Sequence, residues 1–459
     1  MKKILYCFIV LSLSINWESA SQSCLPGENL FTTQASIDNF PINNPGCTEI
    51  EGQVFIQGDD ITNLDGFQGV KSIGNDLVIG QVLGSYPLNP GLTSLKGLDS
   101  LTQVGGDLII DYNQNLETLE GLENLTIVGE KLFVLNNDAL VSLEALQSLS
   151  MVGDMISIVF NSSLIDLQGL GDGNLHTVNA DFFISGNLAL QSLSGLDSIQ
   201  LIQGTLLLLN NPLLSSVDGL EQLTTVNGNL SFTTNAELQS LQGLENLTTV
   251  EGTLSFRENN SLNSLNGLEG LTSVGWFLSI RDNQQLTSID ALQNLQSIDG
   301  ELLISGNTSL ATLEGLSNLS PNSIDKLTIH SCPNLSDCAT ATICNYLSGN
   351  NDAEVYDNSF GCSSINEVLD ACNQVSTKEF NKDELVVSIF PNPTVDIIYI
   401  QDDSGTKWSY CIKDVVGNTV IPQNILRGGQ VDVRDLAHGL YILELNNQER
   451  IEVFHFIKQ

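Results

Sequence analysis

Residues 267–283 read GLEGLTSVGWFLSIRDN and contain the signals from which the fold can be predicted. The dipeptide Gly267-Leu268 recurs along the chain as Gly-Leu or Ala-Leu, from Gly97-Leu98 to Gly315-Leu316. The spacing is 24 residues in every case but one, which is 26, and Gly66-Phe67 precedes the series by 31 residues. A fixed period of this length predicts a solenoid, in which each coil stacks on the next.

The end of the quoted stretch has the pattern of a β-strand. Leu278 and Ile280 alternate with Ser279 and Arg281, which places the two apolar side chains on one face. Stacked coils pair such strands in parallel, about 4.8 Å apart. We therefore expect a mainly β fold, a right-handed parallel β-solenoid of about eleven 24-residue coils, with leucines and valines forming one continuous core.

Asparagine recurs at one position of the coil, shortly after each predicted strand. A buried asparagine at a turn can bond backbone groups of its own coil and of the next, which predicts a structural asparagine ladder. The alternative is ordinary loop asparagines, which are common in turns. The rungs, with Cys332 at the eleventh position, are Asn89, Asn113, Asn137, Asn161, Asn187, Asn211, Asn235, Asn259, Asn283 and Asn307.

This repeat resembles the receptor L-domain, a leucine-rich-repeat-like unit found outside the cell in the insulin and epidermal-growth-factor receptors, and more closely its bacterial secreted form. The resemblance covers roughly residues 24–372 and implies a fold but no ligand. The residues that carry it include Gly267, Leu268, Leu271, Thr272, Ser273, Val274, Gly275, Leu278, Ile280 and Asn283.

The N-terminus has the pattern of a secretory signal peptide, residues 1–21. Lys2 and Lys3 precede an apolar run at residues 4–15, and small residues follow, with cleavage expected between Ala20 and Cys24. The alternative is a lipoprotein that begins at Cys24. The apolar run is short for a transmembrane segment, and we expect none downstream.

Cysteines cluster at the two ends of the repeats, where a solenoid needs caps. Cys24 and Cys47 bracket the start, and Cys338, Cys344, Cys362 and Cys372 crowd the end. Export permits disulfides, so we expect stapled caps at residues 22–65, which include the first coil, and at residues 332–372, on either side of a repeat solenoid at 66–331. Zinc is the alternative for the last four, although they lack a CxxC unit. Their connectivity stays open, and Cys332 and Cys411 are expected to be free.

A different domain follows a polar linker at residues 373–384. Residues 385–459 contain short alternating strands between turns, which predicts a small β-sandwich. They resemble the type A C-terminal sorting domain of the type IX secretion system of Bacteroidota. The matching segments are Phe390-Pro391-Asn392-Pro393, Asp414-Val415-Val416-Gly417, Leu436-Ala437-His438-Gly439-Leu440-Tyr441, and Lys458 near the end. The resemblance implies the type IX machinery as a partner, and then removal of the tail with attachment or release of the cargo. The alternative is a β-sandwich module without a sorting role.

The chain is strongly acidic, with 54 acidic and 16 basic residues and a formal net charge of −38. From Cys47 to Cys372 there are 39 acidic and six basic residues, a balance of −33. This charge excludes nucleic acids and anionic lipids as electrostatic partners. Calcium near Asp59, Asp60 and Asp65 is an alternative to a simple solubilising surface. No EF-hand pattern supports it, and we expect no metal.

The sequence also lacks the common catalytic motifs, and we expect no cofactor and no enzymatic activity. Of the four histidines, His330 falls on the outward side of the last strand, where a surface role is expected. Arg257-Glu258 and Arg281-Asp282 occupy equivalent positions in consecutive coils. They are the candidate for a catalytic site of the β-helix type, and a surface ion-pair cluster is the alternative.

The outward strand positions change character along the repeats. In earlier coils they are apolar, and in later coils they are polar, as at Ser231, Thr233, Ser255 and Ser279. A contiguous exposed apolar patch usually marks a partner site. The alternative is that residues 82–87 or the N-terminal cap cover it. The predicted binding residues, besides Arg257 and Arg281, are Ile109, Phe133, Leu135, Val159, Phe183, Leu207 and Leu209.

These features together predict a secreted or cell-surface binding or adhesion protein of a Gram-negative bacterium, with an unknown protein or glycan ligand. Two alternatives remain from the sequence, namely a β-helical polysaccharide-active enzyme and a structural surface-layer component.

Overall fold

The computed structural model describes residues 22–80, 89–170, 173–376, 388–401, 407–414, 418–447 and 451–459. The predicted signal peptide at residues 1–21 and the insertion at residues 82–87 lie outside these ranges. The chain divides into two compact units, residues 1–373 and 374–459. Within the described ranges, no helix has the length and apolar character to cross a membrane.

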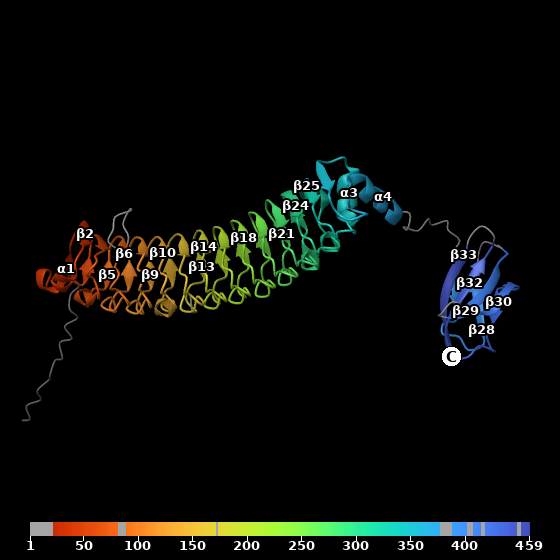
Figure 1. Cartoon of the computed structure of the whole chain (residues 1–459), viewed down its shortest axis with the longest axis horizontal. Helices are drawn as coiled ribbons and strands as arrows, with labels where there is room; N and C mark the ends of the chain where they lie inside the picture. The colour runs from red at the N-terminus through yellow and green to blue at the C-terminus, as the bar shows by residue number, and fades with distance from the viewer. Residues whose placement is uncertain are drawn as a thin grey trace, which may run out of the picture. The chain divides into compact units, whose positions relative to one another are not determined.

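Unit 1 is a stack of coils along one 14-stranded parallel sheet (Figure 1). This confirms the predicted mainly β solenoid. The strands of this long sheet, in spatial order, are β2 (Glu28–Phe31), β4 (Gln53–Ile56), β6 (Leu77–Gly80), β8 (Leu108–Asp111), β10 (Leu132–Leu135), β12 (Ile156–Val159), β14 (Phe182–Ser185), β16 (Leu206–Leu209), β18 (Leu230–Thr233), β20 (Leu254–Arg257), β22 (Leu278–Arg281), β24 (Gly300–Ser305), β25 (Ile324–His330) and β26 (Ala353–Tyr356).

The first twelve coils, those of β2 to β24, also contribute a two-residue strand each to one of two shorter parallel sheets. One contains β1 (Ser23–Cys24), β3 (Glu49–Ile50), β5 (Ser72–Ile73), β7 (Gln103–Val104), β9 (Ile127–Val128) and β11 (Met151–Val152). The other contains β13 (Thr177–Val178), β15 (Leu201–Ile202), β17 (Thr225–Val226), β19 (Thr249–Val250), β21 (Ser273–Val274) and β23 (Ser297–Ile298).

The register keeps equivalent residues of successive coils side by side. Leu206 pairs with Phe182 on one side and with Leu230 on the other, and all three side chains are fully buried. Strand residues alternate between the core and the outside. Each apolar position of the repeat therefore becomes a column that runs through one continuous core.

The Gly-Leu turns take two forms, and these explain the glycine-to-alanine exchanges in the repeat. Gly195 has φ +105°, and a Cβ there would lie 2.1 Å from the Leu167 carbonyl oxygen. Ala145 and Ala291 instead lie in 3₁₀ turns, where φ is negative and a side chain is tolerated. The 3₁₀ turns are η1 (Asp65–Phe67), η2 (Glu144–Leu146), η3 (Asp290–Asn294), η4 (Glu314–Leu316) and η5 (Pro321–Ser323).

Disulfide-linked caps close both ends of unit 1. At the start, α1 (Gln34–Asp38) and α2 (Phe40–Asn43) bring Phe40 against Phe31 and Phe67, and Cys24 is bonded to Cys47. The Cys24 sulfur is therefore not available for a lipid.

At the other end lie α3 (Ala341–Ser348) and α4 (Ile365–Ser376), with the disulfides Cys338–Cys362 and Cys344–Cys372. These four sulfurs cannot also be zinc ligands. Helix α4 continues to Ser376, so the first residues of the predicted linker are helical, because the amphipathic pattern extends beyond Cys372. Cys332 is buried and free, and its burial raises the pKa of the thiol.

Unit 2 consists of two antiparallel sheets. The core between their strands includes Ile398, Trp408, Ile412, Leu443 and Phe456. The first sheet has β27 (Ser388–Phe390), β28 (Ile397–Gln401) and β31 (Gln430–Asp432), and the second has β30 (Thr419–Ile425), β29 (Ser409–Asp414), β32 (Gly439–Asn446) and β33 (Ile451–Lys458).

Candidate binding surface

The side of the long sheet that points away from the core carries the predicted binding residues. We call this side the outer face. Its apolar half is a set of half-buried side chains on β8 to β16, in contrast to the fully buried positions between them. The apolar half consists of Ile109, Phe133, Leu135, Val159, Phe183, Leu207 and Leu209.

Neighbouring strands bring these side chains together in pairs. Ile109 is the register partner of Phe133, Leu135 of Val159, and Phe183 of Leu207. The row is interrupted by polar residues. Ser157 stands between Phe133 and Phe183 and is only 7% exposed, which indicates that the two rings shield it. The apolar half is therefore contiguous in space although its sequence pattern is not.

Asp111 also interrupts the apolar half, as the register partner of Leu135. Burial raises the pKa of its carboxyl group, and the Asn136 side chain donates a hydrogen bond of 2.9 Å to it. This partner allows a carboxyl group to lie beside the apolar row.

Two exposed aromatic residues flank the apolar half and were missed by the sequence reasoning. Tyr112 and Phe160 are 37% and 52% exposed and have φ of 56° and 57°. The Phe160 ring lies over Gly186 of the next coil. A Cβ at that position would lie 2.3 Å from the ring, so the glycine leaves room for it. An aromatic residue directly before a ladder asparagine was the signal that could have identified both.

The N-terminal cap does not cover the apolar half within the described residues. Its phenylalanines pack at the end of the coil stack, and Leu30 on β2, the first strand of the long sheet, is 53% exposed. The other predicted cover, residues 82–87, lies outside the described ranges.

The polar half of the outer face lies on β18, β20 and β22. We define it as Ser231, Thr233, Ser255, Arg257, Ser279 and Arg281. Arg257 is the register partner of Arg281, and it forms an ion pair of 2.8 Å with Glu258. The predicted ion-pair cluster is thus present for Arg257. The five ion pairs of the described residues do not include Arg281.

His330 lies three strands beyond Arg257 in the same row. Its ring stacks on Tyr356 with the centroids 4.7 Å apart, and its Nδ1 lies 3.3 Å from the Ser305 hydroxyl. Ser305 is only 5% exposed. A serine this deeply buried is poorly placed to attack a substrate, so the contact fits a structural role.

The asparagine ladder lies on the inside of the coil, behind this surface. All ten ladder asparagines are fully buried. Asn211 shows the repeating pattern: its Nδ2 donates to the Ile184 carbonyl at 2.9 Å, and its Oδ1 accepts from the Asn187 backbone at 3.1 Å. At the C-terminal end, Cys332 takes a rung and donates its backbone N–H to Asn358 Oδ1 at 3.0 Å. Asn358 is a further rung that the sequence analysis missed.

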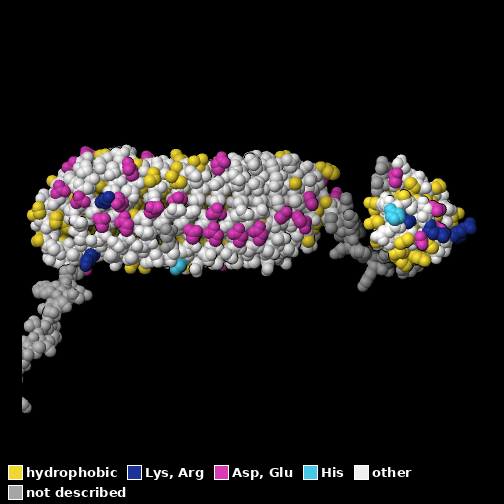
Figure 2. Space-filling model, turned by 90° about the horizontal axis from the view of Figure 1, so that it is seen from below, with side chains coloured by type: hydrophobic (Ala, Val, Ile, Leu, Met, Phe, Trp, Pro, Cys, Tyr) yellow, Lys and Arg dark blue, Asp and Glu magenta, His cyan; other side chains and the backbone are white. Residues whose placement is uncertain are grey.

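Acidic side chains follow one another in a line along one side of unit 1 (Figure 2). A carboxylate follows six of the Gly-Leu pairs and accepts a hydrogen bond from the glycine backbone two residues earlier, as Glu245 does from Gly243 at 2.9 Å. These carboxylates satisfy turns of their own coils. The series comprises Asp99, Glu123, Asp197, Glu221, Glu245 and Glu269.

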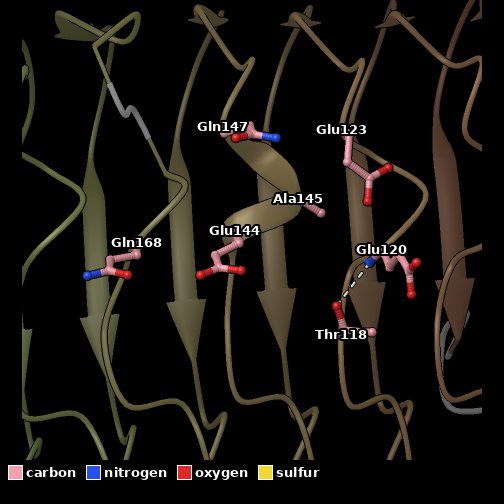
Figure 3. Close-up of a pocket in the computed structure, with 7 residues that line it drawn as sticks. All are labelled: Thr118, Glu120, Glu123, Glu144, Ala145, Gln147 and Gln168. Atoms are coloured by element: carbon pink, nitrogen blue, oxygen red, sulfur yellow. Dashed lines mark hydrogen bonds between the residues drawn. The ribbon is translucent and has the colours of Figure 1, made fainter.

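A shallow hollow of about 400 Å³ lies beside these turns (Figure 3). Its acidic residues include Glu120, Glu123 and Glu144. Glu120 already pairs with Lys96 at 2.9 Å, and Glu123 bonds the Gly121 backbone. Among the residues that the structure describes, no group of three or more acidic, histidine or cysteine side chains is arranged to hold a metal, and this includes Asp59, Asp60 and Asp65.

In unit 2 the Pro-Asn-Pro motif holds the last strand in place. Asn392 Nδ2 donates to the His455 carbonyl, and Asn392 Oδ1 accepts from the Ile457 backbone, both at 2.9 Å. Thr394 is 1% exposed, and its backbone bonds both Ile457 and Gln459. The motif near the start of the tail therefore fixes its C-terminal end.

Comparison with known proteins identifies this tail. Residues 388–459 match the secretion system C-terminal sorting domain family, which confirms the predicted sorting domain. No curated protein matches the chain significantly. The parallel solenoid is compatible with the receptor L-domain resemblance, but the family match covers the tail alone. The sorting domain implies engagement with the type IX machinery and indicates that the protein is exported to the cell surface or secreted.

Proposed function

We propose that this protein is an exported binding or adhesion protein that recognises a partner through the outer face of its solenoid. The observation that carries the proposal is the apolar half, which the described residues leave uncovered on a chain that bears a sorting domain. A contiguous apolar patch at the surface usually marks a partner site. We also propose that the repeat is of the receptor L-domain type, which its 24-residue period and parallel solenoid support.

We further propose recognition without catalysis. Three observations support this. The His330 ring stacks on Tyr356 and lies within hydrogen-bonding distance of the Ser305 hydroxyl, and Ser305 itself is buried. The recurring carboxylates accept hydrogen bonds from backbone N–H groups of their own turns. A long flat sheet suits an extended contact better than it suits an enclosed reaction site.

The proposal can be tested with the double variant Phe133→Asp with Phe183→Asp. Both rings are half-buried, so the change places two charges in the centre of the apolar half without removing a core side chain. The full chain and the variant would be applied to arrays of extracellular proteins and glycans. We expect binding by the wild type and at least tenfold weaker binding by the variant, because burying an unpaired charge is strongly unfavourable.

A matched control adds the same two charges elsewhere. Thr225→Asp with Ser273→Asp changes half-buried positions on β17 and β21, in the short sheet, which are two strands apart like Phe133 and Phe183, and should leave binding unchanged. Circular dichroism would establish that both variants fold. Equal binding by the two folded double variants would show that the apolar half is not the partner site.

A further inference from the structure

The polar half of the outer face places two arginines next to each other. Arg257 and Arg281 are register partners on adjacent strands, so their backbones lie about 4.8 Å apart. Like charges directly opposite each other destabilise a sheet. The fold does not require arginine here, because the same row carries Leu209, Thr233 and Ser305 on β16, β18 and β24.

Only one of these two charges is neutralised within the described part of the chain. Glu258 pairs with Arg257, but the equivalent Asp282 is directed elsewhere. A Cβ on Gly306 would lie 2.1 Å from Asp282 Oδ1, which places that carboxylate over the next coil. Arg281 is half-buried, and its Nε is buried with no hydrogen-bond partner among the described residues. The Nε–H of this guanidinium group therefore lacks an acceptor among the described residues.

The surroundings of the arginine pair are rich in hydroxyl groups. Ser231 and Ser255 are register partners in the adjacent row, and the Ser231 and Thr233 hydroxyls lie 3.3 Å apart, whereas Ser279, the next residue of the row, is only 4% exposed. The core of a stable protein–protein interface is apolar and aromatic, and this surface is not. Hydroxyl groups repeated at the strand spacing suit a ligand that itself repeats polar groups.

We propose that the polar half binds an anionic polysaccharide, whose carboxylate or sulfate groups accept hydrogen bonds from Arg257 and Arg281 while its hydroxyl groups bond Ser231 and Ser255. The planar fork of arginine matches both anions. Acidic groups farther than about 8 Å from the arginine pair are largely screened at physiological ionic strength, and the anion of the ligand competes with Glu258 for Arg257. This inference rests on the proposed binding function and names a ligand class for a separate part of the same face.

The test uses the full chain and four soluble polymers: dextran sulfate, polygalacturonate, neutral dextran and poly-glutamate. Isothermal titration calorimetry should detect binding of one or both anionic polysaccharides and none of dextran. The dextran sulfate and polygalacturonate arms distinguish sulfate from carboxylate recognition. Arg281→Ser, which introduces the residue found at position 305 of the same row, should weaken binding at least about tenfold.

Lys96→Ser is the matched control, because it also removes one positive charge from unit 1, at a lysine already paired with Glu120. It should bind like the wild type. Arg281→Ser should unfold at the same or a higher temperature than the wild type, since it relieves a like-charge contact. A clear loss of thermal stability would assign Arg281 a structural role instead.

Three other results would overturn the proposal. They are equal binding by Arg281→Ser and Lys96→Ser, absence of binding to either anionic polysaccharide, and poly-glutamate binding as tight as polysaccharide binding, which would favour an acidic protein partner. The Phe133→Asp with Phe183→Asp variant separates the two hypotheses. It should keep polysaccharide binding, so a failure of the arginine site leaves the test of the apolar half intact.

Discussion

Removing one rung from the middle of the asparagine ladder should destabilise the solenoid locally. Asn211→Ala deletes the amide that bonds the Ile184 carbonyl at 2.9 Å and the Asn187 backbone N–H at 3.1 Å. Both backbone groups are left without a partner in a site that excludes water. Each such group costs about 1–3 kcal/mol, so we expect a loss of roughly 2–6 kcal/mol.

Long repeat arrays often unfold in parts, and a global melting curve would then be difficult to interpret. Native-state hydrogen exchange avoids this problem. The Asn187 amide donates directly to the deleted side chain, so its protection should fall by at least about 30-fold, the factor that corresponds to about 2 kcal/mol.

Asn227→Ala is the matched control. The Asn227 side chain is exposed and bonds Gln203 at 2.6 Å on the surface, so its loss should change stability by less than about 0.5 kcal/mol. If the Asn187 amide exchanged at the same rate in both variants, the ladder would not carry the structural role that its geometry indicates.

Three further predictions follow from the turns, the caps and the tail. Gly195→Ala should destabilise its own coil by at least about 2 kcal/mol more than Gly173→Ala does, measured by native-state hydrogen exchange of the neighbouring amides, because both glycines have positive φ but only a Cβ at 195 meets backbone within 4 Å; equal losses would attribute the effect to φ alone. Replacing Cys344 and Cys372 by serine should lower the stability of the C-terminal cap by about 3 kcal/mol, seen as faster proteolysis in α4, and an unchanged cleavage rate would contradict this. In unit 2, hydrogen bonds from the Arg434 side chain and backbone lower the pKa of Asp432 from 3.8 to about 2, so the stabilisation is complete above about pH 5 and is lost as pH falls toward 2; Arg434→Gln should raise the carboxyl pKa, followed by NMR, part of the way back to 3.8, because the backbone hydrogen bond remains.

The regular part of the fold could be predicted because it depends on residue type at a fixed period. Leu206 and Leu208 are buried for the same reason in each coil, and the repeat alone indicates their column. The export signal in the tail was equally readable, because Asn392 and Lys458 belong to a distinctive set of motifs.

Other features depend on backbone geometry that the repeat pattern does not express. The acidic residue after most Gly-Leu pairs suggested a solvated surface, whereas Glu245 and its equivalents bond their own turns. Whether a turn has positive φ or is a 3₁₀ turn becomes evident only when Ala145 and Gly195 are compared in space. Arg281 and Asp282 are adjacent in sequence, yet the aspartate is directed toward Gly306.

The constant register of the long sheet has a consequence for how such a protein changes length. Phe182 could pair with Leu230 as it now pairs with Leu206, since all three fill the same column. Excision or duplication of one 24-residue unit, such as residues 206–229, would rejoin equivalent positions and leave both terminal caps intact. The length of the solenoid can thus evolve in increments of a single coil, about 4.8 Å each.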